Sequence, residues 1–369
     1  MTAHPTLKPR QGILEIAPYQ AGASKAAHDG RVFKLSSNEN PLGPSPAAID
    51  AYRAVGAHLH LYPDGGHTAL RAAIGEVYDL DPARIVCGAG SDEIICMLCK
   101  AYAGPGDEVL HSAHGFLMYK LYALGAGATP VSAPESQLHT DIDAMIAALT
   151  DCTRLVFVAD PNSPTGTMVG IEALTRLADA LPPRAMLVID GAYAEYLTGY
   201  DGGAALVEER DNVVMTRTFS KIHGLGALRL GWGYGPAHVV DVINRIRGPF
   251  NVTAGALAAG EAAVRDQDWV AHCLAENAKW RGWLAEELSR IGIPSTPSHA
   301  NFLLAHIGPD AGACEAHMAS QGVLVRGMAG YGLPQHLRIT VGDADGCHAV
   351  VASIADWQQS GARAAGQAG

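Results

Sequence analysis

Short apolar runs alternate with amphipathic stretches along the first two thirds of the chain. Apolar residues recur every three or four positions over 92–102, 141–149 and 172–181, which predicts helices that bury one face. The apolar runs between such stretches are short and have the length of buried strands. These predicted strands span 84–87, 108–111, 128–132, 154–159, 185–190, 212–216 and 230–234.

This alternation is typical of an α/β fold in which a mostly parallel sheet is covered by helices on both faces. We assign residues 36–250 to a large domain of this kind, with a seven-stranded sheet. Ligands of such sheets bind at the carboxyl ends of the strands, so polar residues that follow a predicted strand are candidates for a site.

The pattern changes after Pro249, where a long helical stretch over 268–291 begins a second region. We predict strands and shorter helices after it, and therefore a smaller α+β domain. To this domain we assign 251–369, together with the irregular segment 1–35, which we expect to pack on it. The predicted strands span 300–306, 322–326 and 335–341, and the predicted helices 312–320 and 344–358.

Composition narrows the classes of partner. A formal net charge of -11 and the lack of a Lys/Arg run argue against nucleic acid, which proteins bind through clustered cations. We expect no membrane partner, because no run approaches the roughly 20 apolar residues that span a bilayer. Seven cysteines without framework spacing predict reduced thiols and a cytoplasmic location. Cys96 and Cys99 lie in an apolar helical run, where core thiols are favoured over a metal site.

One lysine carries the strongest chemical signal. Lys221 ends the sequence Thr218-Phe219-Ser220-Lys221, and Arg229 follows in a glycine-rich stretch. A lysine can form an imine with an aldehyde, while hydroxyl and guanidinium groups hold a phosphate on the same ligand. This combination predicts pyridoxal phosphate, although a lone Ser-Lys pair is more often an ordinary loop lysine.

Other candidate groups follow predicted strands. Ser91 and Asp92 follow Gly88-Ala89-Gly90 at the start of a helix, where backbone N–H groups either bind an anion or simply cap the helix. Asn162 lies between two prolines, which would present its amide with little conformational freedom.

Two further residues fit the ring of the predicted cofactor. Asp190 ends an apolar strand, where a buried carboxylate needs a cation such as a protonated pyridine nitrogen. Tyr193 could reach the ring oxygen, and Phe116 either stacks on the ring or belongs to the core.

Several longer motifs of the chain support the same assignment. With these motifs, the chain resembles the pyridoxal-phosphate-dependent aminotransferases of fold type I, and most closely the histidinol-phosphate aminotransferase family, over nearly its whole length. The motifs are Ser37-Asn38-Glu39-Asn40-Pro41-Leu42-Gly43-Pro44-Ser45, Tyr62-Pro63-Asp64-Gly65, the Asn162 loop (160–166), the strand end at Asp190, Ser220-Lys221, Leu228-Arg229-Leu230-Gly231, Gly322-Val323-Leu324-Val325-Arg326, Tyr331-Gly332-Leu333-Pro334 and Leu337-Arg338-Ile339-Thr340.

The resemblance implies a role for each matched position. Lys221 would bind the cofactor covalently and move the proton, Asp190 would face the ring nitrogen, and Asn162 and Tyr193 would contact the ring oxygen. Phe116 would stack on the ring, but the run from His111 to Phe116 departs from the family's usual pattern, which leaves His114 as a second candidate. The residues implied in phosphate binding are Ser91, Asp92, Thr218, Ser220, Arg229 and, from the other subunit of a homodimer, Tyr62.

The resemblance also implies a substrate. Arg326 and Arg338 flank a loop rich in glycine and tyrosine, and two forked guanidinium groups suit a phosphate dianion. Tyr19 would line the substrate side, together with Asn162. We therefore expect transfer of an amino group between L-histidinol phosphate and 2-oxoglutarate, yielding imidazole-acetol phosphate and glutamate, in histidine biosynthesis.

Three alternatives are consistent with the same residues. An aromatic amino-acid aminotransferase is the nearest, and one enzyme could have both activities. A decarboxylase or lyase could use the same cofactor. A ligand sensor of this fold would need a DNA-binding module, and this acidic chain has no basic helical segment outside the matched region.

Overall fold

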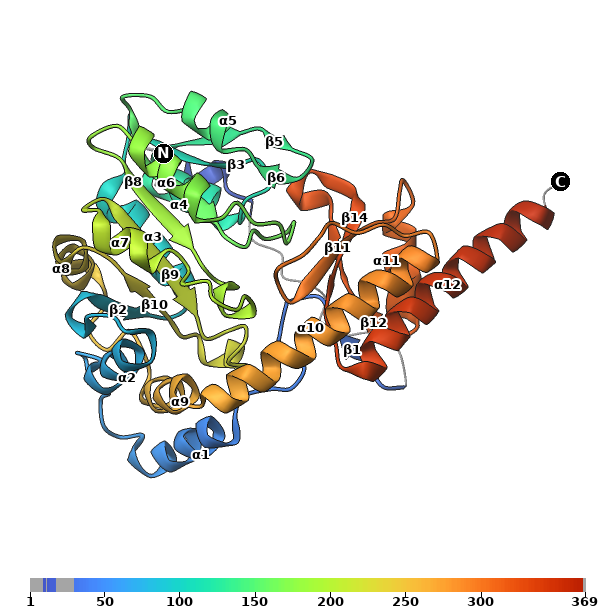
Figure 1. Ribbon diagram of the computed structural model, residues 1–369, viewed down its shortest axis with the longest axis horizontal. Coiled ribbons are helices and arrows are strands. Elements are labelled where there is room, and N and C mark those ends of the chain that lie inside the picture. Colours follow the sequence, from blue (N-terminus) through green and yellow to red (C-terminus); the bar gives the residue numbers. More distant parts are fainter. Residues whose placement is uncertain (1–8, 11, 18–29, 368–369) are drawn as a thin grey trace, which may run out of the picture.

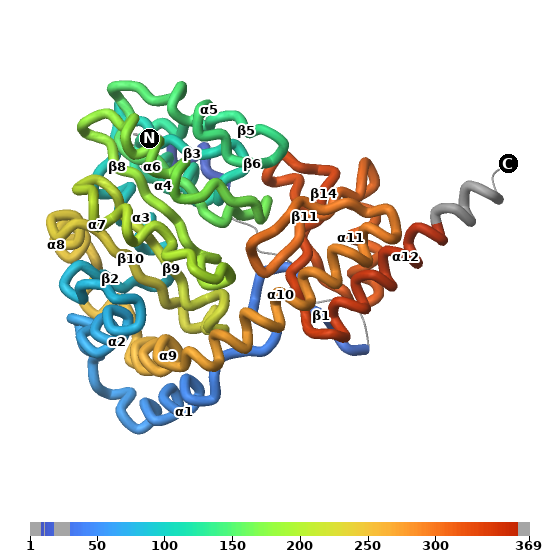
Figure 2. The backbone as a smooth tube through the Cα atoms, viewed as in Figure 1, coloured from blue at the N-terminus to red at the C-terminus, as the bar shows by residue number. Residues whose placement is uncertain are grey.

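The computed structural model describes residues 9–10, 12–17 and 30–367. Within this part of the chain, a larger and a smaller body are joined by the long helix α10 (Gln267–Arg290), as Figure 1 shows. Figure 2 traces α10 from its start beside α9 in the larger body to the smaller body, where α11 and α12 lie.

A seven-stranded sheet forms the centre of the larger body, in the order β2-β10-β9-β8-β7-β3-β4. All pairs between β4 and β9 are parallel, whereas β10 is antiparallel to both of its neighbours. All seven predicted strands occur, with ends displaced by no more than two residues. They are β2 (Ile85–Gly88), β3 (Glu108–Ser112), β4 (Thr129–Ala133), β7 (Thr153–Ala159), β8 (Met186–Asp190), β9 (Val213–Thr218) and β10 (Gly231–Tyr234).

Both faces of the sheet are buried, because successive side chains of a strand point to opposite faces. In β8, Leu187 and Ile189 join one core cluster, while Met186 and Val188 join the other. Helices cover each cluster, which explains why these strands are apolar throughout. The helices of this body are α1 (Pro46–Ala54), α2 (Thr68–Tyr78), α3 (Ser91–Tyr102), α4 (Met118–Ala126), α5 (Ile142–Ala147), α6 (Ile171–Ala180), α7 (Ala204–Glu209), α8 (Ala237–Ile246) and α9 (Ala254–Arg265).

The predicted domain boundary at residue 250 does not coincide with the change of core. Ala256, Ala259 and Ala263 of α9 pack into the first core cluster of the larger body, and α9 contacts α1 and α2. The change falls within α10, where Leu284 belongs to the core of the smaller body. A run of small apolar residues does not show which neighbour it packs against, and the division of the chain at residue 250 stays a prediction.

The smaller body contains a three-stranded antiparallel sheet, in the order β11-β14-β13. The predicted strand at 322–326 is divided in two, and its first half pairs with β1 (Phe33–Lys34) from the N-terminal segment. The elements are β11 (Phe302–His306), α11 (Ala311–Ser320), β12 (Val323–Leu324), β13 (Arg326–Met328), β14 (Leu333–Thr340) and α12 (Ala344–Gln367).

The N-terminal segment does not pack on the smaller body alone. β1 does so, as expected, but the Arg10 guanidinium donates to the Gly125 carbonyl of α4, in the larger body, at 2.5 Å. Arg10 and β1 therefore contact different bodies, and the assignment of 1–35 to the smaller domain stays a prediction.

Among the described residues, no helix is both long and apolar enough to cross a membrane.

Candidate active site

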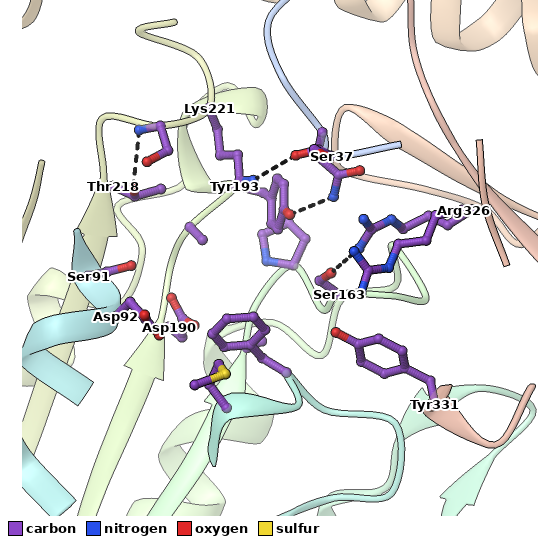
Figure 3. A pocket seen from close by; sticks show the side chains of 18 of the residues that line it. Ser37, Ser91, Asp92, Ser163, Asp190, Tyr193, Thr218, Lys221, Arg326 and Tyr331 are labelled. Carbon is purple, nitrogen blue, oxygen red and sulfur yellow. Dashed lines mark hydrogen bonds between the residues drawn. The ribbon is translucent and has the colours of Figure 1, made fainter. Parts of the chain in front are cut away.

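A cavity of about 360 Å³ lies at the carboxyl ends of β7, β8 and β9. Its volume falls within the range of small-molecule sites, and its position agrees with the rule for parallel sheets. Residues of the smaller body complete its wall (Figure 3). The sequence-predicted residues that line it are Ser91, Asp92, Phe116, Asp190, Tyr193, Thr218, Ser220, Lys221, Arg229, Arg326 and Arg338.

The start of α3 forms one end of the cavity. Ser91 and Asp92 are the first two residues of the helix, so the positive end of its dipole points toward the cavity. Opposite them, the Arg229 guanidinium donates to Ser220 Oγ at 3.2 Å, and the Ser220 amide donates to Thr218 Oγ1 at 3.1 Å. Hydroxyl, guanidinium and helix N-terminus together suit a phosphate monoester.

Two glycines allow these elements to approach. A Cβ atom on Gly90, whose φ is +90°, would lie 2.6 Å from a terminal nitrogen of Arg229. A Cβ atom on Gly231 of β10 would lie 2.1 Å from the Ser91 amide nitrogen. The space in front of α3 therefore depends on the absence of two side chains, and a helix cap alone would not require this.

Lys221 points into the cavity beside Tyr193 (Figure 3). Its ammonium nitrogen lies 3.4 Å from the Ser37 carbonyl and 5.6 Å from the centre of the Tyr193 ring. The Tyr193 hydroxyl accepts a hydrogen bond from the Asn38 amide at 2.8 Å. Burial alone would raise the pKa of Tyr193, but the charges of Lys221 and Arg338 bring this pKa below its usual value.

Asp190 is buried at the end of β8 and accepts hydrogen bonds from two hydroxyl groups. Tyr119 donates to Oδ2 at 2.7 Å, and Thr216 donates to Oδ1 at 3.2 Å. Burial raises the pKa of Asp190, while these two hydrogen bonds lower it. Both donors are uncharged, so a cation in the cavity would favour the ionised carboxylate further.

Phe116 and His114 occupy different places. Phe116 lines the cavity, with its ring edge-on to Tyr119 at 5.6 Å between centroids. His114 instead pairs with the buried Glu135 carboxylate, 2.7 Å from Nδ1 to Oε2. This geometry favours Phe116 as the stacking residue.

The loop around Asn162 places Ser163, and not Asn162 itself, in the cavity wall. The Asn162 amide donates to Thr165 Oγ1 at 2.9 Å and to the His114 carbonyl at 3.3 Å, so it holds the loop in place. Ser163, the next residue, lines the cavity and accepts from Arg338 at 3.3 Å. Contact between Asn162 and a ring oxygen stays a prediction.

The two predicted substrate arginines are cross-strand neighbours. Arg326 of β13 pairs in register with Arg338 of β14, and both line the cavity. Arg338 is buried and donates to the Ser36 carbonyl at 3.1 Å. Like charges directly opposite each other on paired strands repel, and an anion bound between them removes this cost.

Two predicted residues lie elsewhere. Tyr62 is 83% exposed and stacks on Phe250, with ring centroids 4.7 Å apart. Tyr19 falls outside the described residues.

A comparison with protein families matches residues 30–354 to the family of aminotransferase class I and II. The match covers both bodies and every described residue of the cavity wall. The chain belongs to the aminotransferase class I and II family.

Curated relatives of this aminotransferase match over almost its whole length. A protein of Dinoroseobacter shibae named histidinol-phosphate aminotransferase is 61% identical, covering 96% of this chain and 99% of the relative. One of Ruegeria pomeroyi with the same name is 57% identical, covering 95% and 98%. Among solved structures, a histidinol-phosphate aminotransferase of Sinorhizobium meliloti in complex with pyridoxal-5'-phosphate has a TM-score of 0.87 at 25% identity, covering 97% and 99%.

Sequence reasoning did not single out several residues of the aminotransferase site. Tyr119 gave no chemical signal of its own, although its ring contacts that of Phe116, three positions earlier in the sequence. Ser163 was hidden by the more conspicuous Asn162. Tyr331, which also lines the cavity, ends the short 3₁₀ helix Ala329–Tyr331; its motif was noted in the sequence, but no role was assigned to it.

Proposed function

We propose that this protein is a pyridoxal-phosphate-dependent histidinol-phosphate aminotransferase of histidine biosynthesis. It transfers the amino group of L-histidinol phosphate to 2-oxoglutarate, and the products are imidazole-acetol phosphate and glutamate. Relatives with this name, up to 61% identical over nearly the full length, support the assignment.

The observation that carries the substrate assignment is the cross-strand arginine pair. Arg326 and Arg338 face the same cavity from neighbouring strands, so a substrate with two negative charges gains a forked partner on each side. A single carboxylate needs only one such fork. A phosphate monoester therefore suits this pair better.

The large-body half of the cavity fits pyridoxal phosphate. Its phosphate would be held by the α3 N-terminus, Thr218, Ser220 and Arg229, in the space that Gly90 leaves open. The chemistry supplied by this cofactor is an aldehyde that exchanges amino groups, on a ring that withdraws electrons. Asp190 would keep the ring nitrogen protonated, because a buried carboxylate favours a cation beside it.

The chain's own groups then handle the proton. Lys221 is tethered close to Tyr193 and can carry a proton on Nζ between substrate and cofactor carbons on one face of the cavity. Phe116, which lines the same cavity, would stack on the cofactor ring. Ser37, Asn38 and Ser163 fix the orientation of Lys221, Tyr193 and Arg338 by the hydrogen bonds described above.

We further propose that the protein is a homodimer. Large apolar side chains are exposed around α1 and the segment that follows it, including Tyr52 at 50%, Leu59 at 78% and Leu61 at 58%. Such a patch marks an interface, and the family resemblance places Tyr62 at the partner's phosphate site. We also propose a cytoplasmic location, which the seven free cysteines support.

Substrate profiling tests the function. With 2-oxoglutarate as acceptor, kcat/KM for histidinol phosphate should exceed that for phenylalanine or tyrosine on the order of 10²-fold, because only the phosphate engages both arginines. Arg326→Gln should raise KM for histidinol phosphate and leave phenylalanine nearly unaffected, whereas the exposed control Arg53→Gln should change neither. A wild-type preference for phenylalanine would instead identify an aromatic aminotransferase.

The role of Lys221 has a separate test. Lys221→Ala should lower turnover on the order of 10³-fold or more, because the general base is lost. In the wild type, borohydride should fix the cofactor to a peptide containing Lys221. The exposed control Lys120→Ala should retain both turnover and labelling, and turnover near the wild-type rate in Lys221→Ala would refute the assignment.

A further inference from the structure

A short hairpin of the larger body reaches the smaller body beside the cavity. It consists of β5 (Glu135–Ser136) and β6 (His139–Thr140), joined by Gln137 and Leu138. Figure 1 shows this hairpin next to β14, at the junction of the two bodies.

The hairpin turn has an unfavourable backbone conformation. Gln137 and Leu138 have φ of +49° and +64°, a left-handed pair that two-residue hairpins usually form with Asn-Gly. Leucine rarely adopts this conformation, because its Cβ crowds the following carbonyl. Leu138 is kept there although glycine would fit better, which indicates that its side chain has a role.

That side chain packs into a socket of the smaller body. The socket consists of the buried residues Leu304, Met328 and Leu333, and Tyr331 packs against the same residues. Leu304 lies opposite Arg338 in the β11–β14 pair, and Met328 ends the short strand that begins with Arg326. The socket is therefore the support of the arginine pair and of Tyr331.

The base of the hairpin is anchored to the cofactor side of the cavity. The Glu135 carboxylate accepts from the Ser112 hydroxyl and from the His114 amide, the latter at 2.9 Å, and also pairs with the His114 ring. These residues precede Phe116. The Leu138 carbonyl accepts from Thr167 Oγ1 at 3.1 Å, which ties the tip to the Asn162 loop.

We propose that the β5–β6 hairpin is a brace between the two walls of the active site, and that Leu138 is its positioning residue. Glu135 fixes one end to the turn that carries Phe116. Leu138 fixes the other end to the strands that carry Arg326 and Arg338. The brace thus sets the distance between the cofactor site and the anion site, and this inference rests on the proposed aminotransferase function.

Glycine substitutions in the turn separate this role from simple packing. Leu138→Gly relieves the backbone and removes the side chain from the socket. Gln137→Gly relieves the backbone equally, but Gln137 is exposed and lies outside the socket. Leu138→Met restores an apolar side chain. For each variant, KM and kcat with histidinol phosphate, the cofactor dissociation constant and the melting temperature are measured.

Leu138→Gly should raise KM for histidinol phosphate on the order of tenfold while kcat changes little, because the anion site moves relative to the cofactor. Cofactor affinity should stay unchanged, since the larger body holds the cofactor. Gln137→Gly should match the wild type, and Leu138→Met should recover most of the loss. A KM in Leu138→Gly equal to that of Gln137→Gly, whatever the melting temperature, would overturn the inference.

A different result would refute the proposed function. A wild-type protein without activity on histidinol phosphate would refute that substrate, and the same three variants would then be compared with the wild type on the substrate that it prefers. On that substrate too, an increase in KM that is confined to Leu138→Gly would support the brace. No such increase would refute it.

Discussion

At the residue scale, the least expected interaction is the one between Tyr119 and Asp190. Tyr119 is fully buried and stacks on Phe157, with centroids 4.6 Å apart. Burial, and next the Asp190 charge, raise the pKa of Tyr119 well above its usual value, so its hydroxyl remains a donor at any working pH. The hydroxyl holds the carboxylate in place and favours its ionised form.

Tyr119→Phe should therefore raise the pKa of Asp190, because a hydrogen bond that lowers this pKa is removed. In the proposed function the ionised carboxylate is the active form, so the acid limb of the kcat/KM profile should move to higher pH. Cofactor affinity should fall on the order of tenfold, since a hydrogen bond to a charged group contributes about 1.5–3 kcal/mol. The acid limb is measured from the pH dependence of kcat/KM, and the cofactor affinity from a binding titration.

Tyr200→Phe is the matched control for this prediction. Tyr200 donates to the buried Asp160 carboxylate at 2.8 Å, next to the same sheet edge, but Asp160 does not line the cavity. Loss of this hydrogen bond in Tyr200→Phe should reduce stability without moving the acid limb of the kcat/KM profile. An acid limb at the wild-type pH in Tyr119→Phe would show that this hydrogen bond only supports packing.

At the element scale, the decisive contact is between the start of α3 and the Arg229 segment. Neither element specifies the phosphate site alone, because a helix N-terminus attracts anions weakly and Arg229 lies on a loop after β9. Arg229 itself has a left-handed φ of +50°, which directs it back toward Ser220. The two elements can approach this closely because Gly90 and Gly231 have no side chains.

Gly90→Ala should displace the Arg229 guanidinium and weaken phosphate binding, so the cofactor dissociation constant should rise about tenfold, as for the loss of one forked contact. Gly106→Ala provides the comparison, because Gly106 has φ of +87° and a Cβ added there would meet no atom within 4 Å. Gly106→Ala should lose about 1–2 kcal/mol of stability because of its positive φ. Gly90→Ala should lose up to about 3 kcal/mol, because a φ of 90° with a ψ of 161° is adopted almost only by glycine. Equal cofactor affinity in the two variants would contradict the prediction.

At the scale of the whole molecule, Tyr62 distinguishes a dimeric site from a monomeric one. It stacks on Phe250 at the exposed apolar face, and it is not among the described residues that line its own chain's cavity. If Tyr62 completes the partner's phosphate site, each active site draws residues from two chains.

Mixed dimers test this arrangement. Tyr62→Ala and Lys221→Ala subunits, carrying different tags, are produced in one cell. In the mixed dimer, one of the two sites would contain both intact residues, so this dimer should have about half of the wild-type activity. Random pairing makes about half of all dimers mixed, so the whole population should recover roughly a quarter of the wild-type activity. Activity should exceed the average of the two parent variants. No gain in the isolated mixed dimer would place Tyr62 outside the partner's site.

The sequence by itself determined the strands, the residues at their ends and the family. Buried strands and amphipathic helices are visible in one chain because burial of each residue depends mainly on its own polarity. Lys221, Asp190 and Arg229 were found because cofactor chemistry restricts the residue types. The comparisons confirmed the family and the fold class that these features predicted.

The tertiary structure decided which distant residues meet. Tyr119 and Asp190 are 71 positions apart, the register of β13 and β14 sets Arg326 opposite Arg338, and the boundary between cores falls inside α10. The tertiary structure also decided that Ser163, and not Asn162, lines the cavity. Such pairings depend on packing between segments, and the pattern of a single segment records only that it is buried, without naming its partner.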